Sequence, residues 1–209
     1  MPASSTRLQP LGPPARDGRA ERAERTRQAV ADAMLALLEE GDLRPTAQRI
    51  AERAGVSLRT VFHHYQDMES LLALVADTQI ERVVKLARPV PRDGSLDRRI
   101  ESLAAERASL YETIAPVRRS ALLSEPFSPE IASRLQWTRE RNRAEISKVF
   151  AAELRALPPA SRRDLLEALT AAASWSAWEA LRAHQALTPA QAKRVMTRTM
   201  RALLKEVTS

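Results

Sequence analysis

The strongest constraint on the fold lies in residues 46–72, which read TAQRIAERAGVSLRTVFHHYQDMESLL. The small side chain of Ala51 lets a second helix approach closely, and Gly55 can adopt the positive φ that ends a helix. Val61 is then placed to fill the space between two helices. Ser57 stands where the second helix requires an N-terminal cap. The segment therefore predicts two short helices joined by a tight turn.

The second of these helices is expected to have two different faces. At 3.6 residues per turn, Val61 and Tyr65 share one face, which would point into a small core. The outward face carries Leu58, Arg59, Phe62 and His63, with Thr60 and His64 on its flanks. In a DNA major groove, arginine can bond to guanine, histidine to a base or phosphate, and apolar side chains can contact thymine methyl groups. The pattern favours a DNA-reading helix-turn-helix over an ordinary helical hairpin, which needs no glycine, cap and apolar wedge in register.

Residues 25–75 resemble the N-terminal domain of the TetR family of bacterial one-component transcriptional regulators. The matching positions are Val30, Met34, Leu37, Leu38, Pro45, Thr46, Ile50, Ala51, Ala54, Gly55, Val56, Ser57, Thr60, Val61, Phe62, His64, Tyr65, Glu69 and Leu71. The resemblance implies a homodimer that reads palindromic double-stranded DNA. It also implies a small-molecule effector, with release of repression on ligand binding as the commoner mode and activation as the alternative.

The resemblance also suggests which side chains contact DNA. Thr46, Thr60 and His64 fall on positions that commonly contact phosphate. The side chains expected to face bases or backbone in the groove are Leu58, Arg59, Phe62 and His63, and the capping Ser57 completes the candidate set. The family often has a lysine at the start of the fourth helix, where this chain has Met68. One phosphate contact is therefore expected to be missing.

Turn and cap signals divide the rest of the chain into further helices. One helix should end before the run Arg88 to Gly94, which is the expected domain seam. The next helix starts at Ser95 and breaks at Pro116, before a short apolar turn around Leu122 and Leu123. Further helices are expected from Ser128 to Pro158, from about 160 to 186, and from Thr188 to near the C-terminus. We therefore expect an all-α chain of about nine helices, with few β-branched runs to favour sheets.

Three parts are expected along the chain. Residues 1–21 form a disordered basic arm, residues 22–70 a three-helix helix-turn-helix domain, and residues 71–209 a helical bundle for ligand binding and dimerisation. An apolar fraction of 44% is enough to bury a core in a chain of 209 residues. The chain has no cysteine, which excludes disulfides and cysteine-bound zinc. No stretch is apolar enough for a membrane helix or a signal peptide, so we expect a cytoplasmic protein.

The formal net charge of +7 does not by itself identify a DNA-binding region. Most of the basic excess lies in the C-terminal third, where a solvated helix face explains it. The arginines near the N-terminus differ, because a segment rich in proline, glycine and serine holds Arg16, Arg19, Arg22, Arg25 and Arg27 ahead of the first expected helix. Such an arm could reach the minor groove beside a helix-turn-helix. The alternative is a tail without a DNA contact.

The C-terminal half suggests an interface and a pocket. Residues 168–183 place small residues and two tryptophans, Trp175 and Trp178, on a helix. By resemblance the last two helices form the dimer interface, the alternative being burial of these residues in the monomer core. The same resemblance implies a ligand pocket, for which the wall candidates are Tyr111, Trp137, Trp175 and Trp178, with Arg118 or Arg119 to meet an anionic ligand. Each could instead be a core or surface residue. Ligand binding would tilt the connecting helix near residues 67–87.

Enzymatic chemistry has no support in the sequence. His63 and His64 diverge by about 100° on a helix, and no third ligand completes a metal site with them. No phosphate-binding loop, di-iron motif or nucleophile signature is present, so no cofactor is expected. A second hypothesis is a helical ligand-binding or protein-interaction regulator with a vestigial DNA-reading head. Met68 and the outward apolar side chains of Leu58 and Phe62 favour that alternative mildly.

Overall fold

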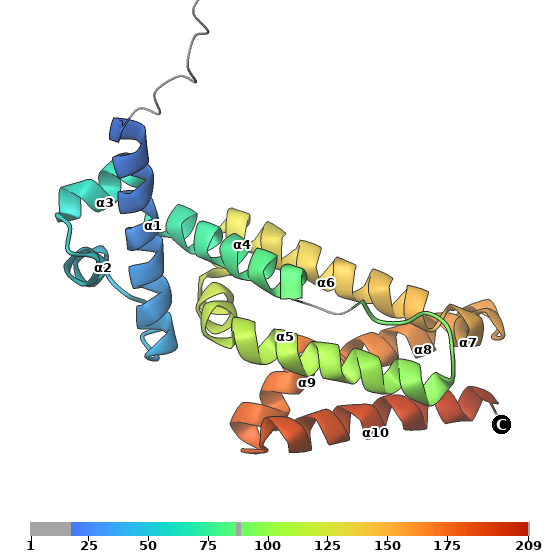
Figure 1. Ribbon diagram of the computed structural model, residues 1–209. Helices are drawn as coiled ribbons and strands as arrows, with labels where there is room; N and C mark the ends of the chain where they lie inside the picture. The colour runs from blue at the N-terminus through green and yellow to red at the C-terminus, as the bar shows by residue number, and fades with distance from the viewer. Residues whose placement is uncertain (1–17, 87–88, 209) are drawn as a thin grey trace, which may run out of the picture.

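The computed structural model describes residues 18–86 and 89–208, and within these ranges the chain forms ten α-helices, one π-helical turn and no strand (Figure 1). The elements are α1 (Gly18–Glu39), α2 (Ala47–Ala54), α3 (Leu58–His64), α4 (Met68–Leu86), α5 (Leu96–Ser124), α6 (Pro129–Val149), α7 (Ala151–Arg155), α8 (Pro159–Ala172), α9 (Trp175–Glu179), η1 (Ala180–His184) and α10 (Pro189–Thr208). The all-α prediction is confirmed, with α1 to α3 gathered at one end of the molecule.

Helices α2 and α3 form the predicted hairpin, and the turn between them uses the predicted residues. Gly55 has φ of 67°, in the left-handed region, and the Val56 N–H donates to the Ala51 carbonyl at 3.0 Å. Ser57 caps α3, since its side chain accepts the Thr60 N–H at 3.1 Å. Val61 is 1% exposed and fills the space between the helices. Local rules of helix termination and capping therefore explain this hairpin.

Helix α4 belongs to two cores at once. Leu71, Leu72 and Val75 are buried with the apolar residues of α1 to α3, and the same cluster includes Val117 of α5 and Ile131 of α6. Helix α4 packs against α1, α5 and α6. The expected domain seam, the run from 88 to 94, therefore comes after a helix whose side chains already pack in both parts of the molecule.

A second core fills the C-terminal bundle, in which α5 packs against α4, α6, α9 and α10. Its largest fully buried side chains include Trp178 and Phe150. The polar atoms of the buried aromatic residues are bonded. The Tyr111 hydroxyl donates to the Ala173 carbonyl at 2.7 Å, and Trp178 Nε1 donates to Glu112 at 3.0 Å. This bonding allows polar aromatic side chains to occupy the interior without loss of hydrogen bonds.

Three expected helix boundaries were wrong. Helix α5 continues through Pro116 to Ser124, although proline removes a backbone hydrogen bond inside a helix. Val117 and Ala121, which follow the proline by one and five residues, are buried in the core shared with α4 and α6. Burial of this turn keeps the segment helical despite the local preference for a break.

The other two differences are extra breaks. The helix expected from Ser128 to Pro158 ends at Val149, whose carbonyl accepts a hydrogen bond from Arg99 of α5 at 2.7 Å, and restarts as α7. The helix expected over 160 to 186 is interrupted at Ala173, because the Ser174 side chain caps a new helix by accepting the Ala177 N–H at 3.1 Å. A serine within a helical pattern can thus start a helix as well as sit inside one.

The ion pair of Arg99 with Glu153 is the best-buried link between α5 and α7. Their side chains are 8% and 10% exposed, and the closest atoms, Arg99 Nη2 and Glu153 Oε1, lie 2.5 Å apart. We expect Arg99→Met to lower the free energy of unfolding by about 3 kcal/mol at neutral pH, since Glu153 would stay buried without a counter-ion. Urea denaturation measures this difference.

The difference in stability between the wild type and this variant should depend on pH. The hydrogen bond from Arg99 lowers the pKa of Glu153 in the folded state, so the stabilisation is present above the unfolded pKa and is lost as pH falls through the lowered folded pKa. The control is Arg201→Met, which breaks a surface pair with Asp97 and should change stability little. Similar losses in the two variants would contradict the role given to the buried pair.

Candidate nucleic-acid interface and internal cavity

Helix α3 presents an exposed face that is both apolar and basic. Phe62 is 51% exposed and Leu58 is 39% exposed, and Arg59 and His63 are also exposed. Arg59 has no hydrogen-bond or ion-pair partner among the residues that the structure describes. Exposure of the two apolar side chains to water is unfavourable. In a DNA groove they would contact thymine methyl groups, and the two basic side chains would bond to base edges or phosphates.

The opposite face of α3 is fixed to the core. Val61 and Tyr65 are buried, as the helical periodicity predicted. The Tyr65 hydroxyl donates to the Arg27 carbonyl of α1 at 2.9 Å, and the Arg27 guanidinium lies 5.8 Å from the centre of the Tyr65 ring. Helical periodicity does not predict this link between α1 and α3, because it shows which face is buried and not which residues that face contacts. The contact orients α3 against α1.

The flanking candidates lie at helix ends and edges. Thr46 caps α2 by accepting the Arg49 N–H at 3.3 Å, and it remains exposed. The hydroxyls of Ser57 and Thr60 lie 2.8 Å apart at the start of α3. The rings of His63 and His64 meet edge to face with centroids 5.4 Å apart, and His64 is half-buried. The starts of α2 and α3 thus carry hydroxyl groups at helix N-termini, a setting that suits a phosphate.

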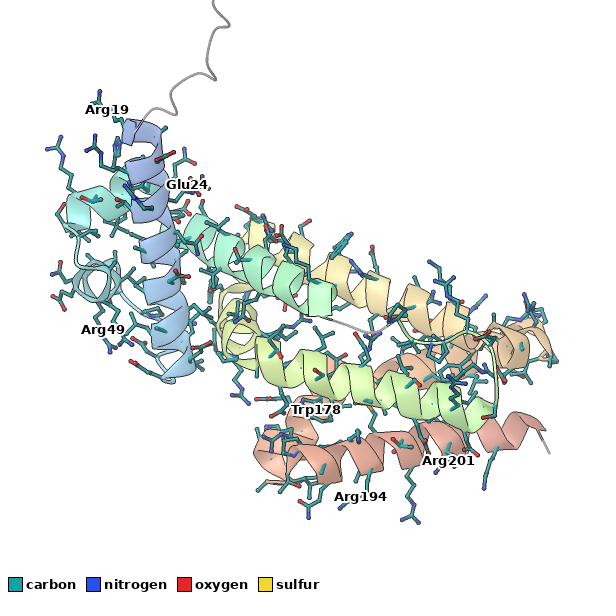
Figure 2. The ribbon with its side chains drawn as sticks, in the orientation of Figure 1. Arg19, Glu24, Arg49, Trp178, Arg194 and Arg201 are labelled. Atoms are coloured by element: carbon teal, nitrogen blue, oxygen red, sulfur yellow. The ribbon has the colours of Figure 1, made fainter. Side chains whose placement is uncertain are left out.

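Two arginines of α2 are already neutralised. Arg49 forms an ion pair with Asp42, and Arg53 forms one with Glu40 at 2.6 Å (Figure 2 labels Arg49 on α2). The hydrogen bond from Arg53 lowers the pKa of Glu40. The positive charge of Arg59 is therefore the one that this hairpin leaves without a carboxylate.

The expectation that Arg19, Arg22, Arg25 and Arg27 precede the first helix was wrong, because α1 begins at Gly18 and includes all four. The continuous helical register of α1 and the contact of Tyr65 with Arg27 hold this segment in place. Figure 2 shows Arg19 on the first turn of α1, at the tip of the molecule. Arg16 and the rest of residues 1–17 lie outside the described residues, so the arm prediction for them stays a prediction.

Met68 opens α4 and is partly buried against the core of α1 to α3. The chain caps this helix with Asp67, whose carboxylate accepts the Ser70 N–H at 2.7 Å. That hydrogen bond lowers the pKa of Asp67. The position where the family often has lysine is therefore used here for apolar contact.

A cavity of about 570 Å³ lies between α4, α5 and α6, with α8 and α9 closing one side. Volumes of this size accommodate small organic molecules. Of the predicted wall residues, Tyr111, Arg118, Trp137 and Trp175 line the cavity. Burial raises the pKa of Tyr111 to about 12, so its hydroxyl stays protonated. Trp137 is 52% exposed, and Arg141 stacks over its ring at 5.3 Å.

Two aromatic predictions need correction. Trp178 does not line the cavity, since it is 1% exposed in the bundle core and bonded to Glu112 (Figure 2). Burial of Trp175 and Trp178 in the monomer also removes them as interface residues, so the core alternative holds for both. The pair of arginine candidates is resolved as well. Arg118 lines the cavity, and Arg119 instead pairs with Glu179 at 2.8 Å.

Several polar residues of the cavity wall were not predicted from the sequence, because they belong to no motif. Arg107 is 3% exposed and bonds both Glu106 and Glu145, at 2.5 and 2.6 Å. Gln79 of α4 is 5% exposed, and Asn142 of α6 lies across the cavity wall. Long-range helix contacts bring these residues together, so no local spacing identifies them.

Over the described ranges, no cluster of three or more histidine, aspartate or glutamate side chains is arranged to hold a metal ion. In the same part of the chain, no helix has the length and apolar character needed to cross a bilayer.

Comparisons with known proteins agree with this geometry. The family model described as "Bacterial regulatory proteins, tetR family" matches residues 31–75, which cover most of α1, all of α2 and α3, and the start of α4. A crystal structure of a transcriptional regulator from Rhodococcus sp. Rha1 has a similar fold, with a TM-score of 0.67 and 20% sequence identity over 90% of this chain and 98% of that chain. A search of curated proteins gave no match. Residues 31–75 therefore match the DNA-binding domain of the tetR family of bacterial regulators, and the fold of the chain is similar to that of a transcriptional regulator.

Proposed function

We propose that the protein is a dimeric, sequence-specific repressor that leaves a palindromic DNA site when a small molecule fills the cavity between α4, α5 and α6. The observation that carries the proposal is the exposed α3 face, which combines Arg59 and His63 with Leu58 and Phe62 on a helix held rigidly by its buried side. We propose that it acts in the cytoplasm and as a regulator rather than an enzyme.

In the proposed complex, α3 enters the major groove. Arg59 would bond to a guanine edge and His63 to a base or phosphate, while Leu58 and Phe62 would contact thymine methyl groups. Thr46, Ser57, Thr60 and His64 would meet phosphates beside the groove and fix the position of α3. Residues 22–70 are proposed as the DNA-reading domain and residues 71–209 as the ligand-binding and dimerisation domain.

A dimer is proposed because two α3 helices must reach half-sites one DNA turn apart, about 34 Å. Helices α8 and α10 pack together, and each has an exposed face that the monomer does not cover. The face of α8 carries Asp164 and Ala171, whereas that of α10 carries Arg194, Arg198 and Ala202. Arg194 extends from α10 in Figure 2. Asp164 of one protomer would pair with Arg194 or Arg198 of the other across a two-fold axis.

Ligand control is proposed to act through α4. Ala76, Asp77, Gln79 and Ile80 of α4 line the cavity, and Leu71 near its start is buried with the reading domain. A ligand that favours one position of α4 would change the separation of the two α3 helices in a dimer. Such a change would pass through α4, because this helix lines the cavity and packs against α1.

Selection of binding sites from random duplex DNA tests the proposal, followed by fluorescence anisotropy of the selected site over a salt series. Enrichment of a palindrome with nanomolar affinity would support a dimeric reader. Only weak binding without sequence preference would favour the alternative, a ligand-binding or protein-interaction regulator with a vestigial reading head.

The combined variant Arg59→Ala and His63→Ala should weaken binding to the selected site by about 1 to 3 kcal/mol, the contribution of a good base contact. Anisotropy with specific and scrambled duplexes measures the change. The control is Arg155→Ala, an exposed arginine of α7 at the other end of the molecule. Unchanged specific affinity in the double variant would support a vestigial head.

Arg22 and Arg25 are exposed on the part of α1 that precedes its contact with α3, and we propose that they reach DNA phosphates or the adjacent minor groove. Replacing both with alanine should make the slope of log affinity against log salt shallower by about 0.9 per lost phosphate contact. Deletion of residues 1–17 measures the contribution of the preceding segment separately. A slope equal to that of the full chain in both cases would exclude contacts from this end.

Ala171→Glu and Ala202→Glu place a charge on the proposed dimer faces of α8 and α10. Each should weaken the dimer by more than about tenfold, because a charge buried without a partner opposes association. Sedimentation velocity over a concentration series measures the dimer dissociation constant. Ala152→Glu on the exposed face of α7 serves as the control. A dimer that survives both substitutions would place its interface elsewhere.

A further inference from the structure

The cavity contains most of the buried polar atoms that lack a protein partner. Among the described residues these atoms include Gln79 Oε1, Arg107 Nε, Arg118 Nε, Arg134 Nε and Asn142 Oδ1, and all five residues line the cavity. A buried polar atom without a hydrogen bond is costly. Because these atoms line one space, a ligand with polar atoms of its own would find hydrogen-bond partners there.

The charges around the cavity are mostly balanced by pairs. Arg107 is bonded to Glu106 and Glu145, Arg134 to Asp77, and Arg139 to Glu125. These carboxylates are therefore already engaged by arginines. A cationic ligand would have to compete with those contacts, which argues against it.

Arg118 differs from these arginines. Its one hydrogen bond within the described residues runs from Nη1 to the Thr138 hydroxyl at 2.9 Å, and no carboxylate there lies within ion-pair distance. Burial lowers the pKa of its guanidinium, as expected for a cation withdrawn from water without a counter-ion. Because arginine stays charged, an anion beside it would compensate the lost hydration.

The rest of the cavity is apolar and partly aromatic. Leu110, Ile114 and Val117 of α5 line it, together with Tyr111 and Trp175, whose rings meet edge to face at 5.7 Å. These side chains would pack favourably against the hydrophobic or aromatic part of a ligand.

We propose that the cavity binds a hydrophobic organic acid, with its acidic group on Arg118 and its apolar body against Tyr111, Trp175 and the aliphatic side chains of α5. The assignment of this acid as the effector rests on the proposed function, whereas its binding to the cavity does not. Arg118 is in this view a specificity-determining residue that selects anions over neutral molecules of the same shape.

A pair of fluorescent probes tests the charge requirement directly. 8-Anilino-1-naphthalenesulfonate carries an acidic group, and N-phenyl-1-naphthylamine has the same ring system without it. We expect Arg118→Met to weaken binding of the sulfonate by at least about tenfold, the loss for one charge-assisted hydrogen bond, and to leave the neutral probe nearly unchanged. Arg118→Gln, which retains a polar group near Thr138, is the second variant in case the first does not fold.

Two controls locate the probes. Arg119→Met removes the neighbouring arginine, which pairs with Glu179 outside the cavity, and should bind both probes like the wild type. Ile114→Trp narrows the cavity and should weaken the binding of both probes. Circular dichroism and thermal unfolding confirm that each variant is folded.

The proposal is overturned if the Arg118 variants bind the sulfonate as the wild type does, or lose both probes equally. Wild-type affinity of Ile114→Trp for both probes would also overturn it, because the probes would then bind outside the cavity. These measurements need no DNA, so a protein that binds the sulfonate through Arg118 and fails to select a DNA site would refute the proposed function and leave the ligand class intact.

Discussion

The structure depends on helix α4 having two apolar contacts at once. Its start is buried with α1, α2 and α3, and its middle packs on α5 and α6 while lining the cavity. Close-packed interfaces of this kind do not deform gradually, so a change on one side of α4 must be accommodated on the other. Helix α4 is therefore the element through which the proposed ligand control would reach α3.

The arginines divide by whether the fold supplies a counter-ion. Arg99 has a buried carboxylate and a helix-end carbonyl, and Arg107 has two carboxylates. Arg59 and Arg118 have no carboxylate partner within the described ranges, the first on the exposed face of α3 and the second in the cavity. Arg99 and Arg107 form ion pairs within the chain, whereas the charges of Arg59 and Arg118 are available to a bound molecule. Exposed arginines such as Arg155 also lack a carboxylate, so the two proposed sites depend as well on the apolar side chains that lie beside Arg59 and Arg118.

Much of the reading domain could be predicted because its rules are local. The positive φ of Gly55, the cap at Ser57 and the burial of Val61 and Tyr65 each depend on residues a few positions apart. The bundle was harder to predict. The end of α6 depends on Arg99, fifty residues earlier in the chain, and the helix through Pro116 depends on burial against other helices. Local sequence patterns do not show such long-range contacts. They therefore predicted a helix break at Pro116 and no break at Val149.

The sequence by itself determined the helical class, the helix-turn-helix and the outward residues of its second helix, since turn, cap and periodicity act within a few residues. It also supplied Tyr111, Arg118, Trp137 and Trp175 as candidates for the cavity, without distinguishing Arg118 from Arg119 or excluding Trp178. Only the tertiary structure decided which arginine faces the cavity, which tryptophan belongs to the core, and that the N-terminal arginines from Arg19 onward are helical. These outcomes depend on partners distant in the chain, because burial and charge pairing are set by the arrangement of whole helices.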